Sequence, residues 1–217
     1  MNKNSPLKKT QKPLQDLEIN AKDIAQQIIE LMQRDIETRD KLIKEGALHE
    51  TYHPSLRKVH HENANKLEEI IKRIGIPTIE KIGKEGYEAS WLIVQHAIEH
   101  PQFMKHYRDS LKAIVRQHKT YAIHFAYLSD RINFFEGRPQ EYGTQFDWDD
   151  HGEMSPYAFD SLEKVNERRK LLGLNTLEEQ MIIMRKHILD TNQKPPENLA
   201  QRKIDFLRWK KEVGWIK

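Results

Sequence analysis

Apolar residues recur at intervals of three and four along most of this chain, a spacing typical of amphipathic helices. In the first such stretch Ile24, Ile28 and Leu31 share one face, and Gly46 lies where the pattern stops. Glycine and proline separate the later stretches in the same way. The pattern predicts seven helices, a short helical turn ending at Gly83 and a basic amphipathic segment at 198–217. The helices are expected at residues 20–47, 54–74, 87–100, 102–117, 120–136, 159–172 and 176–190.

One segment departs from this periodicity. Residues 138–158, RPQEYGTQFDWDDHGEMSPYA, contain two glycines and two prolines and lack helical spacing. We expect a short β-hairpin or an ordered loop there. The predicted fold class is therefore mainly α, a single multi-helix, bundle-like domain with this one irregular segment near 138–158.

Charge distinguishes the two ends of the chain from its body. Residues 1–14 carry four lysines and no acid, and residues 201–217 carry six bases against two acids, so each end has a net charge of +4. The remaining residues carry 26 bases and 31 acids, which leaves the body at −5. The parts that we expect are a basic flexible tail at 1–14, a helical domain at 15–190, and a linker with a basic amphipathic C-terminal appendage at 191–217.

Composition argues against several classes of function. Nucleic-acid binders carry their basic stripe on the folded body, whereas here the excess of base lies on the ends, so we expect no nucleic-acid partner. We also expect no membrane segment, because no apolar run approaches the length of a membrane helix and the N-terminus does not look like a secretory signal. Cysteine is absent, which excludes disulfides and thiol catalysis and fits a cytoplasmic location.

The most apolar of the predicted helices, YEASWLIVQHAIEH at 87–100, contains polar residues among apolar ones. We expect Gln95 and His96 to be buried, where an unpaired polar group costs about 1–3 kcal/mol. Either His96 is a hydrogen-bonded core histidine, or its ring acts in a pocket as acid, base or ligand. His100 follows at a metal-ligand spacing, but no Glu directly follows His96 as in the zincin pattern, and we assign no metal site.

Two charged residues, Asp130 and Arg131, lie between aromatic and aliphatic neighbours in the predicted helix 120–136. Buried charges need partners, and adjacent helical residues point about 100° apart, so each is expected to reach a neighbouring helix or the following loop. In a structural interpretation, Arg131 caps backbone carbonyls and Asp130 anchors a loop. In a functional one, the planar guanidinium of Arg131 binds a carboxylate or a phosphate.

The loop QEYGTQF at 140–146 is the third candidate. Tyr142, Thr144 and Gln145 present a phenol, a hydroxyl and an amide around Gly143, which permits a tight turn or the close approach of a ligand. The acidic stretch that follows matches the first, third and sixth positions of an EF-hand loop. Ala158 stands where that loop requires a bidentate Glu, so we reject a calcium site.

Other features are less informative about chemistry. His60 and His61 lie on a polar stretch of the predicted helix 54–74 and are expected at the surface. The sequence contains no Gly-rich phosphate loop, no GxSxG elbow and no HExxH motif. It therefore identifies neither a cofactor nor a reaction.

Taken together, these segments resemble a known family. The motifs GIP, GxxAxWLIVQHA, AYLSDR, GxPQxYGTQ and ERRxxLGL, in this order, are similar to those of an uncharacterised bacterial domain-of-unknown-function family with QHA, DR and YGTQ motifs. The resemblance covers roughly residues 28–180. It implies a shared helical fold and a common polar cluster, and it brings no established activity. The positions that match the family's motif residues are Asp35, Arg39, Asn63, Gln95, His96, Ala97, Asp130, Arg131, Tyr142, Gly143, Thr144 and Gln145.

The function expected first is that of a small-molecule enzyme or ligand-binding protein with a buried polar pocket formed by the three motifs. In its enzymatic form, His96 is the general base or acid, Asp130 orients it, and Arg131 holds an anionic group of the ligand. The candidate catalytic residues are His96, Asp130, Arg131 and Tyr142. The candidate ligand-binding residues are Asp35, Arg39, Asn63, Gln95, Thr144 and Gln145.

The alternative is a non-catalytic helical interaction module, in which the same side chains form a structural hydrogen-bond network. Trp209 and Trp215 would then belong to its binding surface. The sequence leaves the ligand and the oligomeric state open.

Overall fold

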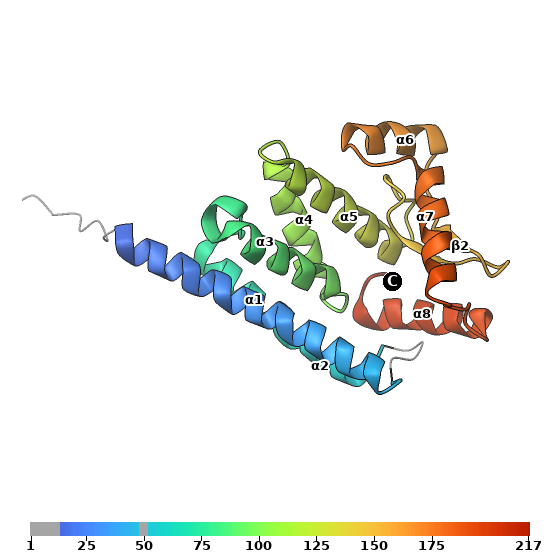
Figure 1. The fold of residues 1–217 in the computed structure, drawn as a ribbon, viewed down its shortest axis with the longest axis horizontal. Helices are drawn as coiled ribbons and strands as arrows, with labels where there is room; N and C mark the ends of the chain where they lie inside the picture. Colours follow the sequence, from blue (N-terminus) through green and yellow to red (C-terminus); the bar gives the residue numbers. More distant parts are fainter. Residues whose placement is uncertain (1–13, 48–51) are drawn as a thin grey trace, which may run out of the picture.

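A computed structural model describes residues 14–47 and 52–217. The predicted tail at 1–14 lies outside these residues except for Leu14, which begins the first helix. The described residues form eight helices and one two-stranded antiparallel sheet, so the predicted mainly α class is confirmed (Figure 1). The helices are α1 (Leu14–Lys44), α2 (Pro54–Ile74), α3 (Ile79–His96), α4 (Pro101–Ile114), α5 (Lys119–Glu136), α6 (Leu162–Leu171), α7 (Leu177–Asp190) and α8 (Leu199–Val213).

The irregular segment at 138–158 contains the expected hairpin. Strands β1 (Phe146–Trp148) and β2 (Met154–Pro156) pair with Asp147 opposite Ser155. The turn between them is held by Asp149, whose carboxylate accepts hydrogen bonds from two backbone N–H groups and one hydroxyl. This acidic stretch therefore stabilises a turn with its own side chain.

The core lies among helices α1 to α5. Helix α1 packs along α3 and α2, and α4 packs on α5 (Figure 1). Apolar side chains at helical spacing fill the space between them, including the completely buried Ile28, Leu67 and Leu128. Helix α2 begins at Pro54, which is suited to a first helical position because it has no N–H to leave unpaired.

Helix α3 differs from the prediction at both ends. It begins at Ile79 and continues through a kink at Gly83, where φ is 74° and the backbone is left-handed. It ends at His96 and not at His100, which instead lies directly before the first residue of α4. His96 and His100 therefore do not share a helical face, and the metal-ligand spacing noted in the sequence has no structural counterpart.

The C-terminal helix α8 and the residues that follow it pack against the turn between α3 and α4. The indole of Trp215 is 4% exposed, stacks on Phe135 and donates to the carbonyl of Ile98 at 2.7 Å. The indole N–H of Trp209 donates to the Glu99 carboxylate at 3.2 Å. Both tryptophans thus contribute to the packing of this protein's own chain.

No helix of the described residues is long and apolar enough to cross a membrane.

Candidate functional site

The loop that follows α5 is anchored by one buried carboxylate. Asp130 is 0% exposed and accepts hydrogen bonds from the backbone N–H groups of Glu141, at 2.7 Å, and Thr144, at 3.0 Å. It also accepts from the N–H of Tyr142 and the hydroxyl of Thr144. Burial raises the pKa of Asp130, and these hydrogen bonds oppose that rise. Both carboxylate oxygens are occupied by the loop, so Asp130 does not orient His96.

Two further buried side chains hold the same loop. The completely buried amide of Gln140 binds the backbone N–H and carbonyl of Gln145. The guanidinium of Arg169, which is also buried, donates to the carbonyl of Tyr142 at 2.9 Å. Gly143 has a φ of +63°, and a Cβ at this position would lie 2.7 Å from Leu177. Gln140 and Arg169 lie in the motifs GxPQxYGTQ and ERRxxLGL, but no pattern in the sequence indicates their roles.

Arg131 joins the loop to α3. Its Nε donates to Oε1 of Gln145 at 3.1 Å, and its Nη1 donates to the carbonyl of Gln95 at 2.9 Å. As expected from their spacing, Arg131 and Asp130 reach different partners. Burial lowers the pKa of Arg131 to about 10. Among the described residues no carboxylate forms an ion pair with this guanidinium, so its charge is left uncompensated.

Arg131 and Gln145 lie on the wall of a cavity of about 500 Å³ between α5, the hairpin and α8, here named the α5–α8 cavity. Two of its cations have carboxylate partners, since Arg202 pairs with Asp147 and Lys203 pairs with Asp150. The residues lining it are Ile98, Arg131, Phe134, Phe135, Gln145, Phe146, Asp147, Trp148, Tyr157, Arg202, Lys203, Phe206, Leu207 and Lys210. The walls are therefore rich in aromatic side chains, with basic groups among the rings.

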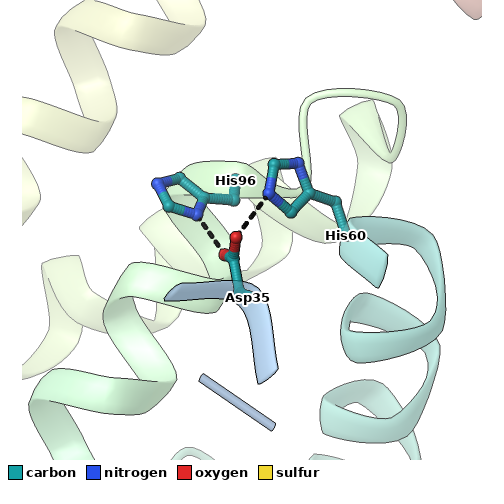
Figure 2. A group of neighbouring side chains, drawn as sticks. All are labelled: Asp35, His60 and His96. Carbon is teal, nitrogen blue, oxygen red and sulfur yellow. Dashed lines mark hydrogen bonds and ion pairs between the residues drawn. The ribbon is translucent and has the colours of Figure 1, made fainter. Parts of the chain in front are cut away.

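A second polar centre lies where α1, α2 and the end of α3 meet. The two oxygens of Asp35 each contact a different imidazole, and Figure 2 shows the rings of His96 and His60 on either side of the carboxylate. Nε2 of His60 lies 2.9 Å from Oδ1, and Nδ1 of His96 lies 2.5 Å from Oδ2. The hydroxyl of Tyr52 lies 2.6 Å from the other ring nitrogen of His60. Carboxylate and imidazole atoms arranged in this way are able to hold a metal ion.

The charge of this centre is set by burial and by the two rings. Burial alone would raise the pKa of Asp35, but its hydrogen bonds with His60 and His96, together with the charges of those rings, hold the pKa well below its usual range. Burial raises the pKa of Tyr52, which keeps its hydroxyl protonated. Asp35 is therefore an anion that faces two basic rings.

The expectation of a surface position is wrong for His60 and right for His61. The His60 side chain is only 11% exposed, because it points at Asp35 across the α1–α2 contact. His61 is exposed, and its Nδ1 lies 2.8 Å from Nε2 of His100. The polar neighbours of His60 in the sequence gave no signal of a buried partner on another helix.

The remaining candidate residues lie apart from both centres or only beside them. The Asn63 amide donates to the carbonyl of Leu31 at 2.8 Å, while its Oδ1 is buried without a partner among the described residues. The Gln95 side-chain nitrogen is likewise buried and unpartnered within the described chain, and only the backbone carbonyl of Gln95 reaches Arg131. Arg39 is exposed on α1. The end of α3 thus contacts Arg131 through the Gln95 carbonyl and Asp35 through the His96 ring, and His96 and Arg131 belong to different centres.

Comparison with known proteins identifies the family of this chain. Residues 22–189, most of the chain, match a family of unknown function. The chain belongs to the family DUF6624. The resemblance to an uncharacterised domain-of-unknown-function family is therefore confirmed. No curated protein and no solved structure matches this DUF6624 chain.

Proposed function

We propose that this DUF6624 protein binds a small molecule that carries an anionic group on a flat apolar body, and that it does so in the α5–α8 cavity. The observation that carries the proposal is the Arg131 guanidinium, which is half-buried at the cavity wall without a carboxylate partner among the described residues. A cation that is partly withdrawn from water is costly unless an anion compensates it. A carboxylate or phosphate of a ligand would supply that anion.

The surrounding charges favour the same ligand. Lys210 also lines the cavity, and its ammonium lies 5.2 Å from the centre of the Phe206 ring, with no carboxylate of the described chain in ion-pair distance. Burial lowers the pKa of Lys210, as it does for Arg131. Two cations that line the cavity without acidic partners among the described residues, one from α5 and one from α8, give it a positive potential, which attracts anions.

The size and the walls of the cavity indicate what the apolar part of the ligand looks like. A volume of about 500 Å³ lies within the range of small-molecule sites, which is roughly 300–1,000 Å³. Phe134 stacks on Phe206 with 5.2 Å between the ring centres, and Tyr157 lies 4.0 Å from Phe134 by the same measure. Flat aromatic ligands pack well against such rings. Arg131 and Gln145, two of the residues expected in a pocket, both line this cavity.

Binding is tested with pairs of compounds that differ in charge. Benzoate and phenyl phosphate are titrated into the full-length protein by calorimetry, with benzamide and inorganic phosphate as the neutral and ring-free counterparts. The aromatic anions are expected to bind at least ten times more tightly than their counterparts, since a charge-assisted hydrogen bond contributes about 1.5–3 kcal/mol. Equal binding of benzamide and benzoate would contradict the proposal.

The role of Arg131 in binding is tested with a matched pair of arginine variants. Arg131→Gln is expected to weaken the binding of phenyl phosphate by about 10-fold or more, because it removes the charge. Arg138→Gln is the control, since Arg138 follows the same helix but is exposed and does not line the cavity. Circular dichroism verifies that both variants fold. Unchanged affinity of a folded Arg131→Gln protein would refute the assignment.

The interaction-module alternative has support at different residues. The loop at 140–145 is held by hydrogen bonds from its backbone to the side chains of Asp130, Gln140 and Arg169. We therefore propose a structural role for these three residues and a ligand-binding role for Arg131 and Gln145. We also propose a cytoplasmic location, because a chain without cysteine needs no oxidising compartment to fold.

A further inference from the structure

The centre formed by Asp35, His60 and His96 shares no residue with the α5–α8 cavity and calls for a separate explanation. We propose that these three side chains bind a divalent transition-metal ion of the Zn²⁺ type. Three helices bring the ligands together from positions 25 and 36 residues apart in the chain. Ligands carried by helices are held more precisely than ligands carried by loops.

The donor set fits such an ion. Two imidazoles and one carboxylate are the ligands of many zinc and non-haem iron sites, whereas magnesium and calcium prefer oxygen alone. The three potential ligand atoms all lie within 4.8 Å of one another. Atoms bound to one Zn²⁺ at about 2.1 Å lie about 3.4 Å apart, so side-chain movements of about 1 Å complete the site.

The atoms around these ligands also suit a metal. A metal-binding imidazole must present a lone pair, and its proton then resides on its other nitrogen. For His60 that nitrogen is Nδ1, and the Tyr52 hydroxyl at 2.6 Å is able to accept its proton in a hydrogen bond. For His96 the other nitrogen is Nε2, on a side chain that is 29% exposed and so reaches water. Both rings therefore change tautomer without leaving a buried N–H unpaired.

The side chains of the three ligands differ in exposure, and this difference indicates where a fourth ligand of the ion would bind. Asp35 and His60 are 4% and 11% exposed in their side chains, while His96 is 29% exposed. The protein supplies three ligands, and a tetrahedral ion takes four. The remaining position faces the more open side at His96, where water or a ligand group completes the coordination, as in catalytic zinc sites.

A second histidine pair provides a matched control. His61 of α2 and His100, which directly precedes α4, contact each other at 2.8 Å, and no carboxylate of the described residues joins them in a potential metal site. The protein is stripped with a chelator, dialysed and titrated with Zn²⁺ by calorimetry. His60→Gln and His96→Gln are expected to weaken Zn²⁺ binding at least 100-fold, and His61→Gln and His100→Gln to leave it within about 3-fold.

Two measurements on chains with an intact ligand set make the proposal independent of how well those variants fold. Co²⁺ is expected to bind once per chain and to give visible absorption bands of nitrogen and oxygen coordination. Tyr52→Phe keeps all three ligands and is expected to weaken Zn²⁺ binding by about 10-fold, the usual effect of losing a partner of a ligand. The proposal is overturned if wild-type protein binds neither ion once per chain, or if binding is lost in His61→Gln and kept in a folded His60→Gln.

Discussion

Replacing Asp130 by asparagine tests how the loop after α5 is held. One oxygen of Asp130 accepts from the N–H groups of Glu141 and Tyr142, and the other from the N–H of Thr144 and from its hydroxyl. An amide keeps one of these oxygens and places an NH₂ group against the N–H of Thr144. A buried hydrogen bond to a charged acceptor contributes about 1.5–3 kcal/mol, and the neutral amide costs less to bury than the carboxylate. We expect a net loss of about 2–3 kcal/mol in the free energy of unfolding.

The measurement is urea unfolding at pH 7, followed by circular dichroism and by tryptophan fluorescence. Asp149→Asn is the matched control, because Asp149 also accepts from two backbone N–H groups and a hydroxyl, those of His151, Glu153 and Ser155, in a more exposed turn. It is expected to lose less stability than Asp130→Asn, because water replaces the lost partner there. If Asp130→Asn lowers stability no more than Asp149→Asn, the carboxylate does not anchor the loop.

Two further predictions concern a glycine and a half-buried histidine. Gly143→Ala is expected to lower the free energy of unfolding by about 2–4 kcal/mol, because the new Cβ would meet Leu177 at 2.7 Å at a positive φ. Gly137 also has a positive φ but lies in open space, so Gly137→Ala is expected to cost about 1 kcal/mol. Equal losses of stability in urea unfolding would contradict the close approach of Gly143 to Leu177. Burial lowers the pKa of His124, stacked on Trp91, from 6.5 to about 4, so the folded chain binds fewer protons than the unfolded chain between these values. The contribution of neutral His124 to the free energy of unfolding is complete above pH 6.5 and falls by about 1–3 kcal/mol as the pH drops to 4. A His124→Phe variant whose stability keeps the wild-type pH dependence would refute this assignment to His124.

The sequence was informative where a local pattern determines the structure. Helical spacing located α2 correctly from Pro54 to Ile74, and the loss of spacing after residue 137 located the hairpin. The rule that buried charges need partners also predicted that Asp130 and Arg131 would each reach a neighbouring helix or the following loop, and Asp130 binds the loop while Arg131 binds both the loop and α3. Each of these inferences needed only the residues nearby in the chain.

Sequence reasoning failed where a distant residue determines the structure. Pro101 suggested a helix continuing to residue 100, yet α3 ends at His96, and carbonyls near this end are satisfied from elsewhere. Arg131 of α5 donates to Gln95, and Trp215 donates to Ile98. No periodicity within α3 reveals such donors, because they lie 36 and 117 residues away.

Dependence on distant residues also explains why the sequence did not indicate the centre formed by Asp35, His60 and His96. His60 lies among polar residues, which is typical of an exposed position, but its partner Asp35 belongs to α1 and is 25 residues away. Asp35 was a candidate through the family resemblance alone, and His96 through its apolar neighbours. Only the packing of α1 on α2 and α3 brings the three together.

The central claim is that the α5–α8 cavity holds an aromatic anion with its charge at Arg131. A crystal of the protein soaked in 4-bromobenzoate, with data collected at the bromine absorption edge, locates the ligand directly. We predict an anomalous peak among the aromatic side chains of the cavity, with the carboxylate within hydrogen-bond distance of the Arg131 guanidinium, and no such peak in crystals of Arg131→Gln. A bromine peak at another place, or a carboxylate that points away from Arg131, would contradict the account.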